Sequence, residues 1–115
     1  MIQPELRERF LRFPQPARLG NLASSLAHAA TSAGLPGEGG TVDHLLDECK
    51  AFIEWSGPDA DPDIQPEMAR MQVDLARWQR RWALAGEDGT FRDEFIRAMR
   101  ENSDRALEWS GLLAE

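Results

Sequence analysis

Four side chains that could bind a metal ion lie close together in the chain: Asp43, His44, Asp47 and Glu48. On a helix they occupy neighbouring turns, where carboxylate and imidazole groups can act as ligands. Di-metal helical bundles, however, require Glu-x-x-His pairs from two helices. No Glu-x-x-His occurs in this sequence. A solvated acidic face is therefore the favoured interpretation, and a metal or small-ligand site on this face is the alternative.

A second acidic cluster alternates along the chain, with Asp59, Asp61 and Asp63 separated by single residues. The first half of a calcium-binding loop has this pattern, but such a loop also needs glycine at its sixth position and glutamate at its twelfth. Those positions are Ile64 and Arg70 here. The segment is therefore interpreted as an acidic connection that leads into a helix.

His28 lies in a helical segment and invites comparison with histidine-phosphotransfer domains, which are also small helical bundles with one exposed histidine. Those domains have a Lys-Gly pair three and four residues after the histidine. This chain has Thr31 and Ser32 there, so a phosphohistidine would lack a nearby cation to stabilise its charge. A surface histidine is the favoured interpretation, and phosphotransfer through His28 remains an alternative.

The segment Arg77–Trp82 combines three arginines with two tryptophans. Trp78 and Trp82 continue the three-and-four spacing of Met71 and Leu75, which predicts that both rings pack inside. The arginines then lie on the flanks, where they can pair with carboxylates or cover apolar surface. The functional alternative is a local cationic patch for an acidic partner.

The remaining reactive groups predict no catalytic centre. Cys49 lies on an apolar stripe, where cysteine behaves as a small hydrophobic residue. No phosphate-binding loop is present, because the Gly37–Gly40 segment lacks the lysine that such a loop needs. The sequence therefore assigns no catalytic, cofactor-binding or metal-ligating residue, and we expect a protein that is not an enzyme.

Composition narrows the class of protein. The 115 residues are 42% hydrophobic and 29% charged, which predicts one globular domain spanning residues 1–115. The net charge of −7 disfavours nucleic acid and anionic membranes as partners. No apolar run is long enough to span a membrane, and the first residues do not resemble a signal peptide. With a single cysteine, these features lead us to expect a cytoplasmic protein.

Clusters of glycine and proline divide the chain into helical segments. The apolar residues between them recur at three and four, the period of a helix buried on one face. The pattern predicts an all-α fold, an antiparallel four-helix bundle preceded by one short extra helix. The expected helices are Pro4–Arg12, Pro16–Ala33, Val42–Ser56, Pro66–Ala85 and Phe91–Leu113.

Each long helix carries its own apolar stripe. The first is rich in small residues, which would let a neighbouring helix approach closely. Asn102 and Ser103 interrupt the last stripe, and a polar group there either bonds across the bundle or lies near its edge. The stripes are Leu19, Leu22 and Leu26; Val42, Leu45, Leu46, Cys49, Phe52 and Ile53; Met68, Met71, Leu75, Trp78, Trp82 and Ala85; and Phe91, Phe95, Met99, Ala106, Trp109 and Leu113.

Two tetrapeptides occur twice, in the order IQPE, EWSG, IQPE, EWSG. IQPE suits a helix start, because proline there loses no hydrogen bond and the acidic residue favours the helix N-terminus. EWSG suits a helix end, with Gly57 and Gly111 expected to take the left-handed conformation. The repeats indicate either two related helical hairpins or convergence on good helix caps. Trp55 and Trp109 should then lie at the same end of the bundle.

Three segments resemble stretches of small uncharacterised proteins of cyanobacteria: Leu19–Ser24, Leu46–Trp55 and Leu75–Trp78. The resemblance implies an all-helical cytoplasmic protein and supplies no activity or site residues.

The leading hypothesis is a non-enzymatic helical bundle that acts through protein–protein contacts, with a homodimer as one possibility. Four Trp, five Phe and four Met are many for a domain of this size, and aromatic residues and methionine are enriched at contact surfaces. The identity of the partner is not encoded in these patterns.

Overall fold

The computed structural model describes residues 2–112, and the regular structure in them is helical. The all-α prediction is confirmed. None of the described helices is both long and apolar enough to cross a membrane. The elements are α1 (Pro4–Leu11), α2 (Gln15–Ala33), α3 (Gly39–Ser56), the short 3-10 helix η1 (Gly57–Asp59), α4 (Gln65–Ala85) and α5 (Gly89–Ser110).

The predicted boundaries needed correction mainly at α3 and α5. We expected α3 to begin at Val42, but it begins at Gly39, because the Val42 amide already donates to Glu38 O at 3.0 Å. At the start of α5, the Asp88 side chain accepts from the Phe91 amide at 3.1 Å, a side-chain N-cap. We expected α5 to run from Phe91 to Leu113, but it begins at Gly89 and already ends at Ser110, where Gly111 takes the left-handed conformation.

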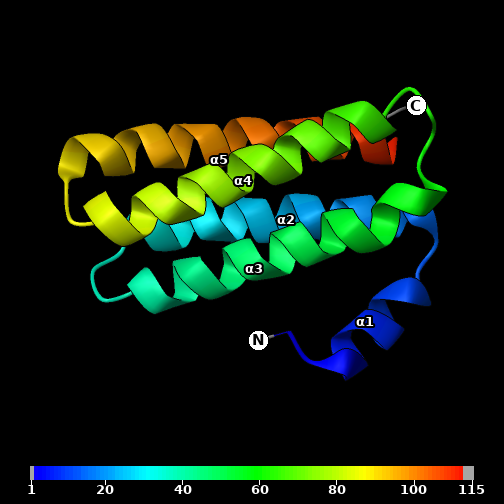
Figure 1. Cartoon of the computed structure of the whole chain (residues 1–115), viewed down its shortest axis with the longest axis horizontal. Coiled ribbons are helices and arrows are strands. Elements are labelled where there is room, and N and C mark those ends of the chain that lie inside the picture. Colours follow the sequence, from blue (N-terminus) through cyan, green and yellow to red (C-terminus); the bar gives the residue numbers. More distant parts are fainter. Residues whose placement is uncertain (1, 113–115) are drawn as a thin grey trace.

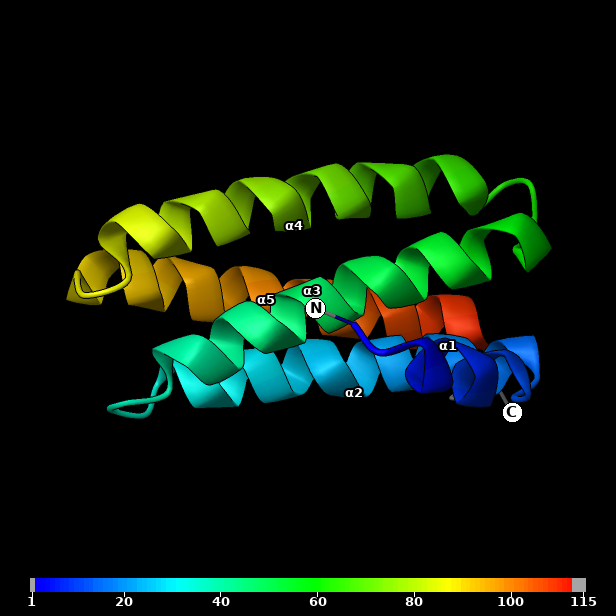
Figure 2. The same ribbon diagram turned by 60° about the horizontal axis from the view of Figure 1, so that its bottom comes forward.

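Consecutive long helices run in opposite directions in Figure 1, and α1 lies beside α3 at one side. Because α3 and α5 run in the same direction, the helix ends that carry Trp55 and Trp109 lie at the same end of the molecule, as expected. Turning the molecule places α4 at the side away from α2 and α1 (Figure 2).

The closest helix pair is α2 with α5. Small side chains make this approach possible, since Ala23 and Ala30 on α2 and Ala106 on α5 are almost completely buried. Ser103 belongs to the same contact, because its hydroxyl donates to Ala23 O at 2.8 Å. The polar interruption predicted at this position therefore bonds across the bundle.

The other predicted stripes also face the core. All six stripe residues of α3 and all three leucines of α2 are buried. On α4, Trp78 and Ala85 are only partly buried, and Trp109 on α5 is likewise partly buried. The buried large residues of α4 are Met68, Met71, Leu75 and Trp82.

Helix α4 is joined to α3 by glutamines as well as by apolar residues. Gln65, Gln72 and Gln79 are spaced by seven residues, or nearly two helical turns, so they share one side of α4. Each side-chain amide donates to backbone carbonyls. Gln65 donates to Gly57 O (3.1 Å) and Ala60 O (3.2 Å), Gln72 to Lys50 O (3.0 Å) and Gln79 to Asp43 O (3.3 Å). We call this row the glutamine ladder.

The two EWSG segments end their helices differently. Gly111 has φ = 70°, the left-handed conformation that was predicted. Gly57 has φ = −54°, so the prediction for this residue is wrong. The chain continues through Pro58, whose fixed φ suits a helical turn, and the Ala60 amide closes η1 by donating to Gly57 O at 3.0 Å.

Helix α1 attaches mainly through one aromatic anchor, and Leu6 and Leu11 pack beside it. The Phe10 side chain is 2% exposed and stacks on Phe52, with ring centroids 4.3 Å apart, and its ring lies 5.7 Å from that of Trp55. Burial of one phenylalanine contributes about 1.5–3 kcal/mol. This is a small attachment energy compared with that of a long helix.

The contact between α2 and α5 leads to a prediction about packing. Ala106→Leu should lower the free energy of unfolding by about 1–3 kcal/mol, because the added atoms have no space between two close backbones. Ala76→Leu, on the exposed side of α4, should change it by less than about 0.5 kcal/mol. Urea unfolding followed by tryptophan fluorescence measures both, and equal effects would contradict the close approach.

Candidate functional site

The four candidate metal ligands on α3 do not face one common point. His44 and Glu48 approach each other, with Nε2 and Oε2 3.9 Å apart, and Glu48 also accepts from the Ser25 hydroxyl at 3.1 Å. Within residues 2–112, no group of three or more His, Cys, Asp or Glu side chains is placed to hold a metal ion.

The two aspartates of this set face α4 instead. Gln79 Nε2 donates to Asp43 Oδ1 and to Asp47 Oδ1, both at 2.9 Å. Lys50 Nζ lies 3.6 Å from Asp47 Oδ1. These carboxylates therefore extend the glutamine ladder and help to join α3 to α4.

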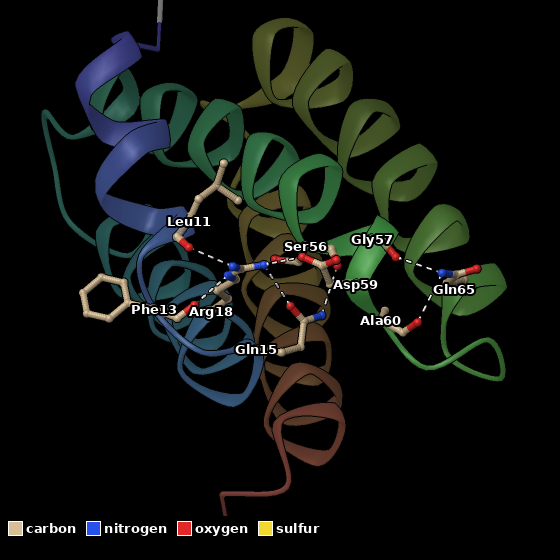
Figure 3. Close-up of polar contacts among 9 residues, drawn as sticks. All are labelled: Leu11, Phe13, Gln15, Arg18, Ser56, Gly57, Asp59, Ala60 and Gln65. Carbon is tan, nitrogen blue, oxygen red and sulfur yellow. Dashed lines mark hydrogen bonds and ion pairs between the residues drawn. The ribbon is translucent and has the colours of Figure 1, made fainter.

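The acidic connection is held by an arginine that the sequence did not single out. Arg18 Nη1 lies 2.8 Å from Asp59 Oδ2, while Nη2 donates to Leu11 O and Nε to Phe13 O, each at 2.8 Å. Figure 3 shows this guanidinium between the α1–α2 connection and Asp59. Gln15 adds a bond from its Nε2 to Ser56 O at 3.0 Å. We call these bonds the Arg18 clamp.

The Arg18 clamp and local hydrogen bonds hold the acidic segment in its conformation. Asp59 pairs with Arg18, and Asp61 Oδ1 accepts from the Asp63 amide at 3.0 Å, which forms a local side-chain turn. The Asp61 carbonyl accepts from the amides of Ile64 and Gln65 as α4 begins. These contacts agree with a connection that leads into a helix.

His28 is exposed on α2, which has no acidic residue and only one arginine, Arg18 near its start. Ser32, at the position where phosphotransfer domains have glycine, is buried. The surroundings of His28 therefore offer no cation on its own helix to a phosphoryl group.

The two tryptophans of the Arg77–Trp82 segment belong to an aromatic cluster with Phe91 and Phe95, in which the ring centroids of Trp82 and Phe95 are 4.8 Å apart. Trp82 Nε1 donates to Gly39 O at 3.3 Å. Arg81 lies over the rings of Trp78 (4.6 Å) and Phe91 (5.2 Å) and pairs with Glu94 at 3.5 Å. The rings therefore pack between helices, and Arg81 covers them.

The edge of Trp82 also borders a hollow of about 280 Å³ between the α2–α3 connection and the end of α4. Its wall includes the ionisable groups Glu87 and Arg92. The Arg92 guanidinium is already engaged, because Nε donates to Gly86 O and the group lies 5.6 Å from the Trp82 ring centroid. The predicted interior position of Trp82 holds, although one side of the ring meets this hollow.

Cys49 is completely buried on α3. Burial raises the pKa of its thiol well above the ordinary value, and the neighbouring Glu48 charge adds to this effect. A thiol in this state is not a nucleophile at neutral pH, in agreement with its assignment as a core residue.

The outer face of α4 exposes two large apolar side chains. Val73 and Leu84 are 51% and 82% exposed. Arg77 and Arg80 lie between them and are also exposed, and within residues 2–112 no carboxylate lies within 4.0 Å of either guanidinium. This face is not used by the core.

Comparison of the chain with protein families, with curated proteins and with solved structures gives no match. The site must therefore be judged on its own chemistry.

Sequence reasoning missed the two polar systems that fix the connections. The glutamine ladder had a readable signal, since three glutamines recur every seven residues. The Arg18 clamp had none, because its acceptors are backbone carbonyls and an aspartate 41 residues away.

The clamp predicts an unequal effect of two truncations. Arg18→Ala should cost about 2–3 kcal/mol of unfolding free energy, because two carbonyls lose a charged donor. Asp59→Asn should cost less than about 1 kcal/mol, since Asp59 is largely exposed. Arg18→Lys should behave like Arg18→Ala, because one ammonium cannot reproduce the fork. Equal costs for Arg18→Ala and Asp59→Asn in urea unfolding would contradict this.

The raised pKa of Cys49 predicts a loss of stability at alkaline pH. The unfolded thiol ionises near its usual pKa of about 8.5, whereas the folded thiol keeps its proton. Unfolding free energy should therefore fall above about pH 8.5, approaching 1.4 kcal/mol per pH unit. The chain has no tyrosine and one lysine, so few other groups titrate there. Cys49→Ala should flatten the profile; two parallel profiles would show that the thiol is not responsible.

Proposed function

We propose that the protein works through contact with another protein rather than through catalysis, and that the outer face of α4 is its contact surface. The observation that carries the proposal is the exposure of Val73 and Leu84 on a helix that also presents two exposed arginines, for which residues 2–112 provide no carboxylate within 4.0 Å. Exposed apolar side chains mark an interaction site when they belong to one patch rimmed by polar groups.

The geometry of α4 supports one continuous face. Val73 and Leu84 are eleven residues apart, about three helical turns, so they point in nearly the same direction. Arg77 and Arg80 fall on the same side between them. A shallow hollow on this helix is lined by Ala69, Arg70, Val73, Asp74 and Arg77, and a second hollow beside Leu84 extends toward Glu94.

The charge of the face indicates the chemistry of its partner. Helix α4 has four arginines and two carboxylates, in a chain of net charge −7. An acidic surface with one or two apolar side chains would complement it. Arginine is favoured at interfaces because its fork pairs with carboxylates while its stem covers apolar groups.

A second copy of this chain fits the same face less well. A two-fold interface places the same patch of both copies together. Arg77 and Arg80 of one copy would then meet the same residues of the other, and like charges at an interface oppose association. The proposed partner is therefore a different, acidic protein.

The test compares two pairs of charge reversals. Binding partners are captured from the native cell by the tagged full chain and quantified by mass spectrometry. Arg77→Glu with Arg80→Glu should reduce capture of a specific acidic partner at least tenfold. The matched pair Arg97→Glu with Arg100→Glu, exposed on α5, should leave capture within about twofold, because it changes net charge equally but lies elsewhere.

Leu84→Asp should reduce capture of the same partner, since it removes the most exposed large apolar side chain of the face. Equal loss with the α4 and α5 pairs would show that net charge alone matters. Unchanged capture with every α4 variant would refute the proposed face.

A further inference from the structure

A hollow of about 370 Å³ lies where the end of α3 faces the start of α4, and we call it the α3–α4 hollow. Among residues 2–112, its lining includes one carboxylate and two side-chain amides but no basic side chain. The lining residues are Ile53, Glu54, Gly57, Pro58, Gln65, Met68, Ala69 and Gln72. A ligand here therefore meets apolar surface together with a negative charge.

The glutamine ladder decides which atoms of the two amides a ligand can reach. Gln65 Nε2 donates to Gly57 O at 3.1 Å and to Ala60 O at 3.2 Å, which uses both of its hydrogens and leaves its oxygen as the free polar atom. Figure 3 shows this nitrogen directed at the two carbonyls and the oxygen directed away from them. Gln72 Nε2 donates to Lys50 O at 3.0 Å, so its oxygen also points away from the α3 backbone. Because a carbonyl can only accept, nitrogen and oxygen cannot exchange places in either amide.

These two amide oxygens and the Glu54 carboxylate are open acceptors. Within residues 2–112, neither Gln65 Oε1 nor Gln72 Oε1 receives a hydrogen bond, and the exposed Glu54 side chain has neither a hydrogen bond nor an ion pair. The backbone amides of Gly57 and Met68 already donate to carbonyls one turn earlier. The α3–α4 hollow thus offers three accepting groups, against one spare N–H of Gln72.

Acceptors and apolar surface alternate along this side of α4. Gln65 and Gln72 are seven residues apart, about 10 Å along the helix axis, and Met68 lies between them on the same side. Ile53 and Pro58 add apolar lining. A ligand that matches the hollow therefore carries hydrogen-bond donors at both ends of an aliphatic stem, and a positive charge to balance Glu54.

We propose that the α3–α4 hollow binds a linear aliphatic polyamine, one molecule per chain. An ammonium group has three donors and no acceptor, so it is complementary to oxygens that can only accept. One ammonium bonds Gln65 Oε1 and another bonds Gln72 Oε1, while the methylene stem lies on Met68 and Glu54 supplies the opposite charge. The net charge of −7 adds a general attraction for cations.

The chain itself places one alkyl ammonium group beside the glutamine ladder. Lys50, whose carbonyl accepts from Gln72, has its Nζ 3.6 Å from Asp47 Oδ1, and the same oxygen accepts from Gln79 Nε2 at 2.9 Å. The carboxylates of α3 and the amides of α4 thus accommodate an aliphatic stem that ends in an ammonium. At the α3–α4 hollow, the lining provides the acceptors without such a cation.

The polyamine site is independent of the contact surface proposed above. The hollow borders the outer face of α4 at Ala69 but uses none of the exposed arginines or large apolar side chains of that face. Either proposal can therefore fail while the other stands.

The experiment titrates the full chain with spermidine by isothermal titration calorimetry at about 0.15 M salt, where exposed charges more than about 8 Å apart are largely screened. We expect one site with a Kd below about 1 mM. Butylamine has only one ammonium, and Mg²⁺ has two charges but neither donors nor a stem. Each should bind at least tenfold more weakly than spermidine.

Two charge reversals locate the site. Glu54→Lys places an ammonium at the hollow and should weaken spermidine binding at least tenfold. Glu101→Lys, exposed on α5, changes the net charge equally and should leave the Kd within about twofold. In methyl NMR spectra of the wild-type chain, spermidine should shift Met68 and Ile53 but not Met99, which is buried on α5.

Equal weakening by Glu54→Lys and Glu101→Lys would show a diffuse attraction to an acidic chain and would overturn the proposal. Affinity for butylamine or Mg²⁺ equal to that for spermidine would exclude a site with donors at two ends. Absence of both heat and methyl shifts at about 10 mM spermidine would also refute it. Because Glu54 is exposed and makes no side-chain bond within residues 2–112, its replacement tests binding without a loss of folding.

Discussion

The contact between α2 and α5 is the constraint on which the rest of the fold depends. Two helices far apart in the chain approach closely because Ala23, Ala30 and Ala106 leave room. The buried Ser103 hydroxyl finds its hydrogen-bond acceptor, Ala23 O, at this contact. With α2 at this position, α3 packs against its other side. Small residues thus set the separation of the central helices, and large ones fill the space around them.

Helix α4 is packed against the bundle in a different way from α2. Bulky methionines and tryptophans lie between it and α5, while the glutamine ladder joins it to the backbone of α3 and η1. Because the core takes one side of α4 and the ladder another, Val73, Arg77 and Leu84 on the outer side have no role in folding that the contacts reveal. A helix attached in this way can present a surface without compromising the core.

The sequence was sufficient for the elements and for most of the core, because helical periodicity depends on local side-chain spacing. It placed Leu22, Leu46 and Met99 inside. For Ser103 it left a bond across the bundle and a place near its edge as alternatives, and the structure shows the bond. Sequence reasoning failed at Gly57, where Pro58 continues the helical turn. It also missed the Arg18 clamp, whose acceptors come together only after the chain has folded. For the same reason, the separation of Asp43 and Asp47 from His44 and Glu48 required the position of α4.

The seven-residue spacing of Gln65, Gln72 and Gln79 affects how α4 can be positioned along α3. Because the three amides are equivalent and evenly spaced, sliding α4 by seven residues along α3 would bring two of them back to carbonyls in the same row. The glutamine ladder thus defines which side of α4 faces α3, but it is compatible with more than one position of α4 along the axis of α3. Contacts that do not repeat, such as the bond from the Trp82 indole to Gly39 O and the burial of Met68 and Leu75, distinguish one position from the other.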